Sequence, residues 1–230
     1  MKKTAKLLTL AVALFAGLGG TAQAEGFKVG ADVVSSYVWR GIDLGNSPAI
    51  QPALSYTFAG NGIVVGAWGS YAVSENDGSR YKEVDLYVTV PVGPFSLTAT
   101  NYYVPSGDND RQFDFSNDGP NVVELSVGYA KDNLSLLAAI NVAGNDTLPG
   151  YENAKYCEAA YKFYDKEGYS AKGVIGFGDQ VYYSDNDRGK ETDNFGLVNT
   201  GISVSKDRYT ASYVYNPNTE ASHLVFMASF

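Results

Sequence analysis

The sequence is poor in the residues that cross-link small exported proteins or build catalytic sites. It has one cysteine, Cys157, and one histidine, His223, in 230 residues. A single cysteine cannot form an internal disulfide, so no cystine framework is expected. In a strand, His223 and its neighbour Ser222 point to opposite faces, so a His-dependent hydrolase would need a serine from another strand. We therefore expect that the protein is not an enzyme.

Charged residues are also scarce, at 18%, and those present are unbalanced. The chain has 17 Lys and Arg against 25 Asp and Glu, a formal net charge of -8. Three of the lysines lie in the first 24 residues, so the remainder is more acidic still. This balance argues against nucleic acid as a partner and against a polybasic lipid-binding surface.

Long apolar runs are missing, apart from one over residues 7–18. That run follows three lysines and leads to the sequence Ala-Gln-Ala at residues 22–24, which is the pattern of a cleaved secretory signal peptide. It is too short, and wrongly flanked, for a stable spanning helix. We expect residues 1–24 to be a signal peptide and residues 25–230 to form one domain.

The rest of the chain shows no helical stripe of useful length and is rich in Tyr (18), Phe (11) and Gly (25). Apolar residues instead recur with a period of two over segments of about ten residues, the length of a membrane-spanning β-strand. About 12 such segments are predicted, at 26–38, 49–58, 62–73, 81–90, 95–104, 121–130, 133–143, 153–164, 168–178, 194–205, 208–215 and 220–230.

The connections between these segments alternate between short and long. The short ones contain Gly, Asn, Asp or Pro and are predicted to be tight hairpin turns, at 59–61, 91–94, 131–132, 165–167 and 206–207. The long ones are 39–48, 74–80, 105–120, 144–152, 179–193 and 216–219. Tight periplasmic turns with longer external loops are typical of an all-β, antiparallel, up-and-down transmembrane barrel of about 12 strands. A soluble β-sandwich is the alternative, but it has no reason to segregate its connections in this way.

The strand faces are consistent with the barrel, because one parity is apolar and the other is mixed. Val84, Leu86 and Val88 alternate with Glu83 and Asp85, for example. In lipid the apolar parity faces outward and the polar parity faces the lumen, but alternation alone cannot say which face is out.

Aromatic residues on the apolar parity help to decide. Tyr37 and Trp39 are expected at the upper end of the first strand, and Tyr56 and Phe58 at the lower end of the second. Tyr and Trp favour the headgroup level of a membrane, so an aromatic belt is predicted there. Ordinary core aromatics are the alternative.

Parity also selects the charged residues of the lumen. The acids are Asp32, Glu83, Asp85, Glu124 and Glu158, and the bases are Lys28, Lys162 and Lys172. An open lumen with this excess of acids predicts a mild preference for cations, whereas charges that pair across it predict a plugged barrel. Arg40 is expected at the outer mouth, either paired with a lumen carboxylate or acting in selectivity, and Gly41 suits the turn that follows.

Two of the long loops are acidic, with Asp108, Asp110, Asp114 and Asp118 in one and Asp185, Asp187, Glu191 and Asp193 in the other. The spacing around Asp185 lacks the terminal bidentate Glu of a calcium loop, so a solvated surface is favoured. Divalent ions could still bridge these loops to lipopolysaccharide. No resident metal or cofactor is expected.

Two segments resemble known motifs, one an assembly signal and the other the opening motif of a protein family. The last segment places Leu224, Phe226, Ala228 and Phe230 on one parity and so resembles the signal that the barrel assembly machinery reads in outer-membrane proteins. Residues 34–42, VSSYVWRGI, followed by PAIQ at 48–51, resemble the opening motif of the TorF-type porin family. That resemblance implies an outer-membrane barrel with a transport function, and it supplies no catalytic residue or substrate.

The sequence therefore predicts a porin of the bacterial outer membrane that lets small polar solutes or ions diffuse passively. A closed structural or adhesive barrel, which binds a partner through its external loops, is the alternative. Outer-membrane lipid and lipopolysaccharide are the expected surroundings, and the oligomeric state stays open.

Overall fold

The computed structural model describes residues 25–230 except 77, 106–109, 118, 145–152 and 185–193. The predicted signal peptide of residues 1–24 lies outside the described residues. So do most members of the two acidic loops, namely Asp108, Asp118, Asp185, Asp187, Glu191 and Asp193. Within the described part, no helix is long and apolar enough to cross a membrane.

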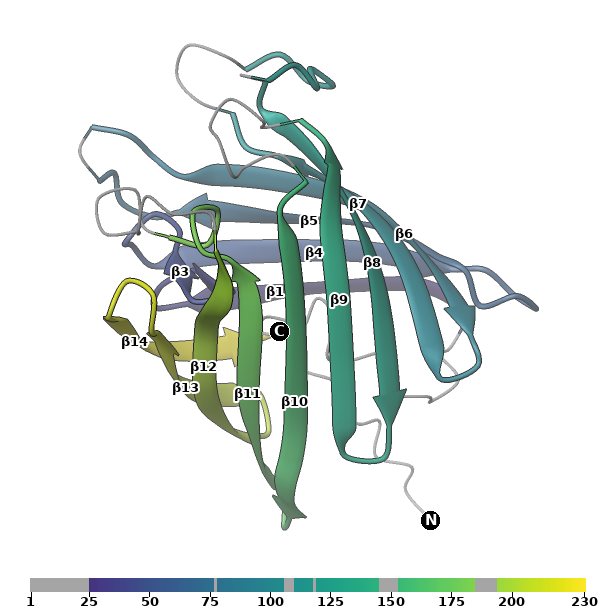
Figure 1. Cartoon of the computed structure of the whole chain (residues 1–230). Coiled ribbons are helices and arrows are strands. Elements are labelled where there is room, and N and C mark those ends of the chain that lie inside the picture. Colours follow the sequence, from purple (N-terminus) through teal and green to yellow (C-terminus); the bar gives the residue numbers. More distant parts are fainter. Residues whose placement is uncertain (1–24, 77, 106–109, 118, 145–152, 185–193) are drawn as a thin grey trace.

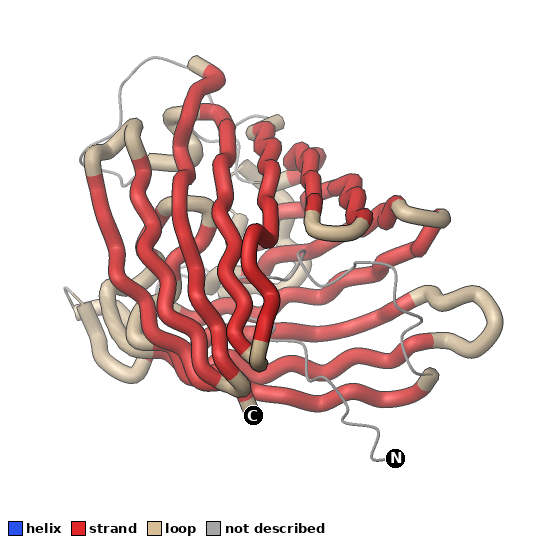
Figure 2. Tube along the Cα trace, turned by 90° about the horizontal axis from the view of Figure 1, so that it is seen from below, coloured by secondary structure: helices blue, strands red, loops and turns tan. Residues whose placement is uncertain are grey.

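Twelve antiparallel strands form a closed barrel in which each strand pairs with its neighbours in the chain and β1 closes against β14 (Figures 1 and 2). These strands are β1 Gly26–Val34, β4 Ala49–Thr57, β5 Val64–Ala72, β6 Lys82–Val92, β7 Phe95–Tyr103, β8 Asn121–Lys131, β9 Leu134–Ala143, β10 Lys155–Lys166, β11 Tyr169–Asp179, β12 Phe195–Lys206, β13 Tyr209–Asn216 and β14 Ala221–Ser229. The predicted fold class and strand number are confirmed.

The barrel is apolar outside and polar inside. On β6, the side chains of Val84, Leu86 and Val88 are 44–48% exposed, whereas Glu83 and Asp85 are 5% and 0% exposed. A water-soluble protein has the opposite arrangement, because it buries its apolar parity. The outer surface of this barrel is therefore suited to contact with lipid.

Short turns gather at one end of the barrel and long loops at the other, as predicted (Figure 1). The short turns use left-handed backbone at Asp132, Glu167 and Asp207, with φ of 55°, 54° and 53°. Asp tolerates this conformation, and two-residue hairpins between twisted strands require it. At the same end, the ring of Tyr56 lies 4.8 Å from Phe27 and 4.9 Å from Phe58 on the outer face.

The path of the chain after β1 differs from the prediction. The first strand was expected to continue to residue 38, but β1 ends at Val34, and residues 35–48 turn into the barrel as a segment that we call the inward hairpin. Its two short strands, β2 Val38–Trp39 and β3 Ile42–Asp43, pair only with each other. Alternation could not reveal the turn, because Tyr37 and Trp39 lie on a parity that suits a lipid face as well as a filled lumen.

The prediction of a lipid-facing belt at Tyr37 and Trp39 is therefore wrong. Tyr37 is 6% exposed, and its ring lies 5.3 Å from that of Trp68 on β5. Trp39 packs inside the barrel, with its ring 5.9 Å from Tyr102 and 5.5 Å from Tyr183. Packing of large aromatic surfaces in the lumen replaces the headgroup contact that was expected.

The seam between β1 and β14 is the shortest of the barrel's pairings, with three register pairs from Asp32–Ser229 to Val34–Met227. Phe230 extends it, because its amide donates to the Ala31 carbonyl at 2.9 Å and its carbonyl accepts from the Ala31 amide at 3.2 Å. The Phe230 ring is 60% exposed on the outside. At the other end of the seam, the Ser35 amide donates to the Phe226 carbonyl at 2.8 Å before the chain turns inward.

Candidate functional site

The inward hairpin crosses the lumen near the long-loop end and touches the opposite wall. Its tip is a two-residue turn in which Arg40 and Gly41 both have positive φ, 49° and 89°, as a type I′ turn requires. A Cβ atom at Gly41 would overlap the carbonyl oxygen of Val198 on β12. Gly41 is therefore needed both for the turn and for close approach to the wall.

A buried ion pair fixes the tip. Arg40 donates two hydrogen bonds to Glu124 on β8, from Nη1 to Oε2 at 2.6 Å and from Nη2 to Oε1 at 2.9 Å. Nη1 also donates to the Tyr183 hydroxyl at 2.8 Å, and Tyr102 donates to Glu124 at 3.2 Å. Burial alone would lower the pKa of Arg40, but the carboxylate of Glu124 raises that pKa well above its ordinary value. The guanidinium therefore stays charged.

Aromatic rings surround the same guanidinium. Its Cζ atom lies 4.6 Å from the ring centre of Trp39, 4.4 Å from Tyr156 and 5.8 Å from Tyr183. Aromatic faces attract a cation most strongly where water is excluded. Arg40 is thus clamped by one carboxylate and three rings that come from different parts of the barrel. We call this group, together with Tyr102, the Arg40 clamp.

The base of the hairpin is held by hydrogen bonds to Asp43. Ser36 donates its hydroxyl to both carboxylate oxygens of Asp43, at 2.8 and 2.7 Å, and the Nδ1 atom of His223 lies 3.8 Å from Asp43. The serine hydroxyl thus bonds to the carboxylate, whereas a hydrolase needs it on the imidazole. Ser222 is exposed on the opposite face of β14 from His223, as parity predicts.

Glu83 and Asp85 face the lumen from β6 as a pair of buried carboxylates. Tyr81 donates its hydroxyl to Glu83 at 3.0 Å. Neither oxygen of Asp85 accepts a hydrogen bond from any residue in the described part of the chain. Two ionised carboxylates with few donors are costly to bury side by side, so this pair more readily shares a proton and carries one negative charge than two.

The remaining predicted lumen residues are distributed along the barrel. Glu158 accepts from Tyr156 at 2.6 Å and from the Asn199 amide at 3.3 Å. Three others approach the short-turn half or the seam: Lys162 bonds Asp165 at 2.6 Å, Lys28 is exposed near the start of β1, and Asp32 is 4% exposed beside the seam. Lys172 lines a cavity together with Glu158. The structure thus brings together Arg40 with Glu124, Glu83 with Asp85, and Glu158 with Lys172.

Sequence reasoning missed several aromatic residues of the clamp. Tyr102 and Tyr156 could have been found, because each lies on the inward parity of its strand, two residues from an inward polar position. Tyr183 follows β11 in a long connection, where no periodicity applies. Nothing in the local sequence indicates that it reaches Arg40.

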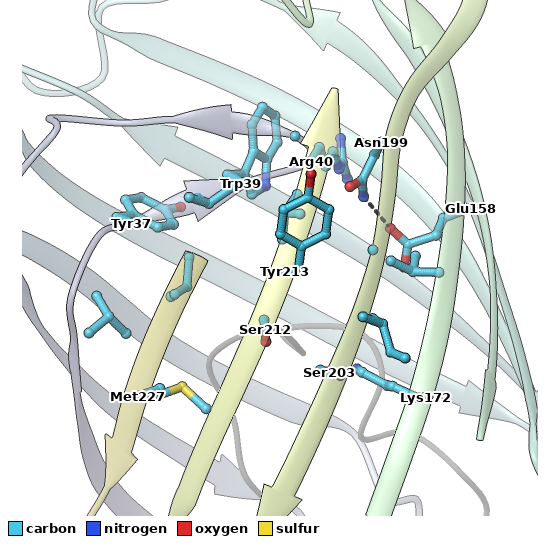
Figure 3. Close-up of a pocket in the computed structure, with 18 of the residues that line it drawn as sticks. Tyr37, Trp39, Arg40, Glu158, Lys172, Asn199, Ser203, Ser212, Tyr213 and Met227 are labelled. Atoms are coloured by element: carbon cyan, nitrogen blue, oxygen red, sulfur yellow. Dashed lines mark hydrogen bonds between the residues drawn. The ribbon is translucent and has the colours of Figure 1, made fainter. Parts of the chain in front are cut away.

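A cavity of about 120 Å³ lies between the inward hairpin and the short-turn half of the barrel (Figure 3). The hairpin residues Tyr37 and Trp39 face it from one side, and Lys172, Ser203, Ser212 and Met227 lie along the wall below them. Trp68 and Gln51 also line it. The lumen is therefore narrowed by the hairpin without being filled. In the described part of the chain, no group of three or more metal-ligating side chains is present.

Comparison with known proteins gives a family. A family model described as a bacterial protein of unknown function (Gcw_chp) matches residues 20–227. The chain belongs to this family. No curated protein matches this Gcw_chp chain.

Several solved structures are similar to this Gcw_chp protein, and two of them are described here. One is titled "Unveiling the Mechanism Behind the in-meso Crystallization of Membrane Proteins", with a TM-score of 0.51 and 10% identity over 90% of this chain and 83% of that one. The other is titled "KdgM porin", with a TM-score of 0.47 and 8% identity over 87% of this chain and 95% of that one. At these identities a likeness concerns the fold alone.

Proposed function

We propose that this protein is an outer-membrane channel through which small polar solutes or ions diffuse, narrowed by the inward hairpin. The observation that carries the proposal is the inverted barrel, with an apolar outer surface and buried polar side chains around an incompletely filled lumen. Transmembrane barrels keep a polar interior whether they are water-filled or plugged, and the cavity that remains beside the inward hairpin favours a water-filled lumen here.

Three features of the sequence support the outer membrane as the location. They are the signal-peptide pattern of residues 1–24, the apolar last segment ending in Phe230, and the motif at residues 34–42 that resembles TorF-type porins. We infer that the barrel assembly machinery inserts the protein, and that its acidic loops lie near lipopolysaccharide. We propose no catalytic role and no resident cofactor.

We expect the channel to prefer cations. Glu83 and Asp85 are buried on the lumen side and form no salt bridge with a described residue, whereas Glu124 is neutralised by Arg40. Lumen carboxylates that no basic side chain neutralises attract cations in pores.

Single-channel recording in planar bilayers tests the proposal. We expect small, stepwise currents from refolded protein, with a reversal potential that favours cations. The matched variant is Glu83→Gln combined with Asp85→Asn, which removes both ionisable carboxyl groups at nearly constant volume. Unchanged reversal potentials in that variant would contradict the cation selectivity, and intact barrels without current in both the parent and Arg40→Gln would contradict the channel.

The second candidate, a closed structural or adhesive barrel, is favoured by one observation. The Arg40 clamp holds the hairpin across the lumen. The side chains of its ion pair are almost fully buried, with Arg40 5% exposed and Glu124 1% exposed. A barrel that needs no passage could keep such a plug permanently. Recordings on Arg40→Gln separate the two candidates, because current in the variant but not in the parent indicates a plugged channel, and current in neither supports the closed barrel.

A further inference from the structure

The cavity below the inward hairpin differs chemically from the rest of the lumen. On the side of β6 to β8, the inward residues are mainly carboxylates, threonines and serines. On the side of β11 to β14, the inward parity carries apolar side chains that line the cavity: Val174, Val214, Val225 and Met227. Leu137, Val38 and the two tryptophans Trp39 and Trp68 complete this apolar lining. A passage for ions alone would not need such a chamber.

A polar row lies directly below the apolar lining. Lys172, Ser203 and Ser212 are register partners on three successive strands, β11, β12 and β13, so their side chains lie at one height on the inner wall. All three line the cavity, and Figure 3 shows them along its lower side. An ammonium group beside two hydroxyl groups offers several hydrogen-bond donors at one level.

The ammonium group of Lys172 makes no salt bridge in the described part of the chain, although the charge of Glu158 acts on it from beyond contact distance. Its register neighbour Lys162 is paired with Asp165 at 2.6 Å, whereas no carboxylate lies within 4.0 Å of Lys172. Glu158 is the facing carboxylate, and it already accepts hydrogen bonds from Tyr156 and Asn199. A lumen cation beside an apolar chamber, whose facing carboxylate is hydrogen-bonded to other residues, is suited to an anion that carries an apolar group.

We propose that the cavity binds a small organic monocarboxylate, with its carboxylate at Lys172, Ser203 and Ser212 and its apolar body against Val214, Val225 and the hairpin. This inference deepens the proposed channel function by naming a solute class, and it rests on that function only for transport. The anion site at Lys172 on β11 lies five strands from Glu83 and Asp85 on β6, so the carboxylates that favour inorganic cations and the site for an organic anion lie on different sides of the lumen. Binding itself needs no conductance. A cavity of about 120 Å³ compares with the ~150 Å³ that holds a benzene ring, so the body has room for roughly four to six carbons.

The protein carries its own reporter for this site. Its two tryptophans, Trp39 and Trp68, both line the cavity. Occupation of the cavity displaces water from their rings and must change the intrinsic emission of the folded barrel. The titration uses refolded full-length protein in detergent with hexanoate, 1-hexanol, hexylammonium and acetate. These probes separate the contribution of the charge from that of the chain.

We expect saturable changes in emission with hexanoate at the lowest concentration, weaker binding of 1-hexanol, and no saturation with hexylammonium or acetate. A charge-assisted hydrogen bond contributes enough that Lys172→Gln should weaken hexanoate binding by about tenfold while changing 1-hexanol by less than about twofold. Lys162→Gln is the matched control, because its ammonium group is already paired, and it should leave hexanoate binding unchanged.

Three results would overturn the inference. They are no saturable emission change in the parent protein with hexanoate, equal affinity for hexanoate and 1-hexanol, or equal effects of Lys172→Gln and Lys162→Gln. If Lys172→Gln does not give the heat-modifiable gel shift of a folded barrel, the double variant Ser203→Ala and Ser212→Ala takes its place, with the same expected loss for hexanoate. Binding without current would refute the channel and leave the site standing, whereas current without binding would do the reverse.

Discussion

At the scale of single residues, Arg40 decides where the inward hairpin lies. Its guanidinium is the only hairpin group among the described residues that makes a bidentate ion pair with the opposite wall. Removal of one partner from a buried pair leaves the other charge unpaired, which costs about 3–5 kcal/mol, whereas removal of both charges costs much less. This difference between single and double variants separates an ion pair from mere packing.

We predict that Arg40→Gln releases the hairpin tip and raises single-channel conductance severalfold. Glu124→Gln should act in the same direction, because Arg40 then remains buried without its carboxylate. The double variant should return toward the parent, since no unpaired charge is left. Conductance and urea unfolding of all four proteins form a double-mutant cycle. Strictly additive effects would contradict a direct ion pair.

Gly41 gives a second prediction at this scale. Gly41→Ala combines left-handed backbone, which costs roughly 1–2 kcal/mol for a residue with a Cβ atom, with overlap on the Val198 carbonyl. Gly93→Ala is the matched control, because Gly93 also has positive φ, 61°, but has nothing within 4 Å of the added atom. We expect only Gly41→Ala to change Trp39 emission and conductance. Equal effects of Gly41→Ala and Gly93→Ala would mean that the left-handed backbone, and not the contact of Gly41 with β12, causes the change.

At the scale of elements, the inward hairpin and the barrel wall are separable. The seam pairs Asp32–Ser229 to Val34–Met227, and the nine register pairs of β1 with β4, all lie outside residues 35–48. The backbone hydrogen bonds between this segment and the wall lie at its two ends, where the Ser35 amide donates to the Phe226 carbonyl at 2.8 Å and the Val73 amide donates to the Pro48 carbonyl at 2.7 Å. The register pairs of the wall are therefore complete without residues 36–46.

We predict that replacement of residues 36–46 by a short Gly-Ser linker leaves a heat-modifiable, folded barrel. The lumen loses its plug in this variant, so conductance should rise by more than it does in Arg40→Gln. A Gly-Ser linker is a suitable replacement, because Gly-Ser chains are flexible and add no charge to the lumen. If the variant no longer folds, the hairpin contributes to the stability of the wall. If its conductance is unchanged, the hairpin does not obstruct the pore.

The strands could be predicted from the sequence, but the hairpin could not. Contact with lipid requires apolar residues at every second position, so strands such as β6 and β9 can be recognised by alternation in the sequence. Residues 35–44 carry no comparable mark, because Tyr37 and Trp39 suit a membrane interface and a lumen equally well. What decides between them is a contact between Arg40 and Glu124, 84 residues apart in sequence. Inward parity did select both Arg40 and Glu124 as lumen candidates, but it could not indicate that they pair with each other.

At the scale of the whole molecule, both tryptophans lie inside the barrel. Trp68 is 3% exposed, and Trp39 packs against Tyr102 and Tyr183 in the lumen. The outer surface, in contrast, presents Leu86, which is 45% exposed on β6. The membrane should therefore reach neither native tryptophan directly.

We predict that vesicles of lipids brominated on their acyl chains quench the emission of the folded protein only weakly. Leu86→Trp places a tryptophan on the outer face and should add a strongly quenched component. Thr89→Trp, on the inward parity of the same strand, is the control and should add an unquenched one. Strong quenching of the parent protein would contradict the inverted arrangement of the barrel.

The short seam between β1 and β14 has a kinetic consequence. It joins segments from the two ends of the described chain, and all other wall pairings link neighbouring strands. Closing so large a loop carries the highest entropic barrier of any pairing, and three register pairs together with the contacts of Ser35 and Phe230 compensate for it. Refolding should thus pass through an open, curved sheet in which the edges of β1 and β14 are still unpaired. The lifetime of these free edges would determine how readily the protein aggregates before the barrel closes.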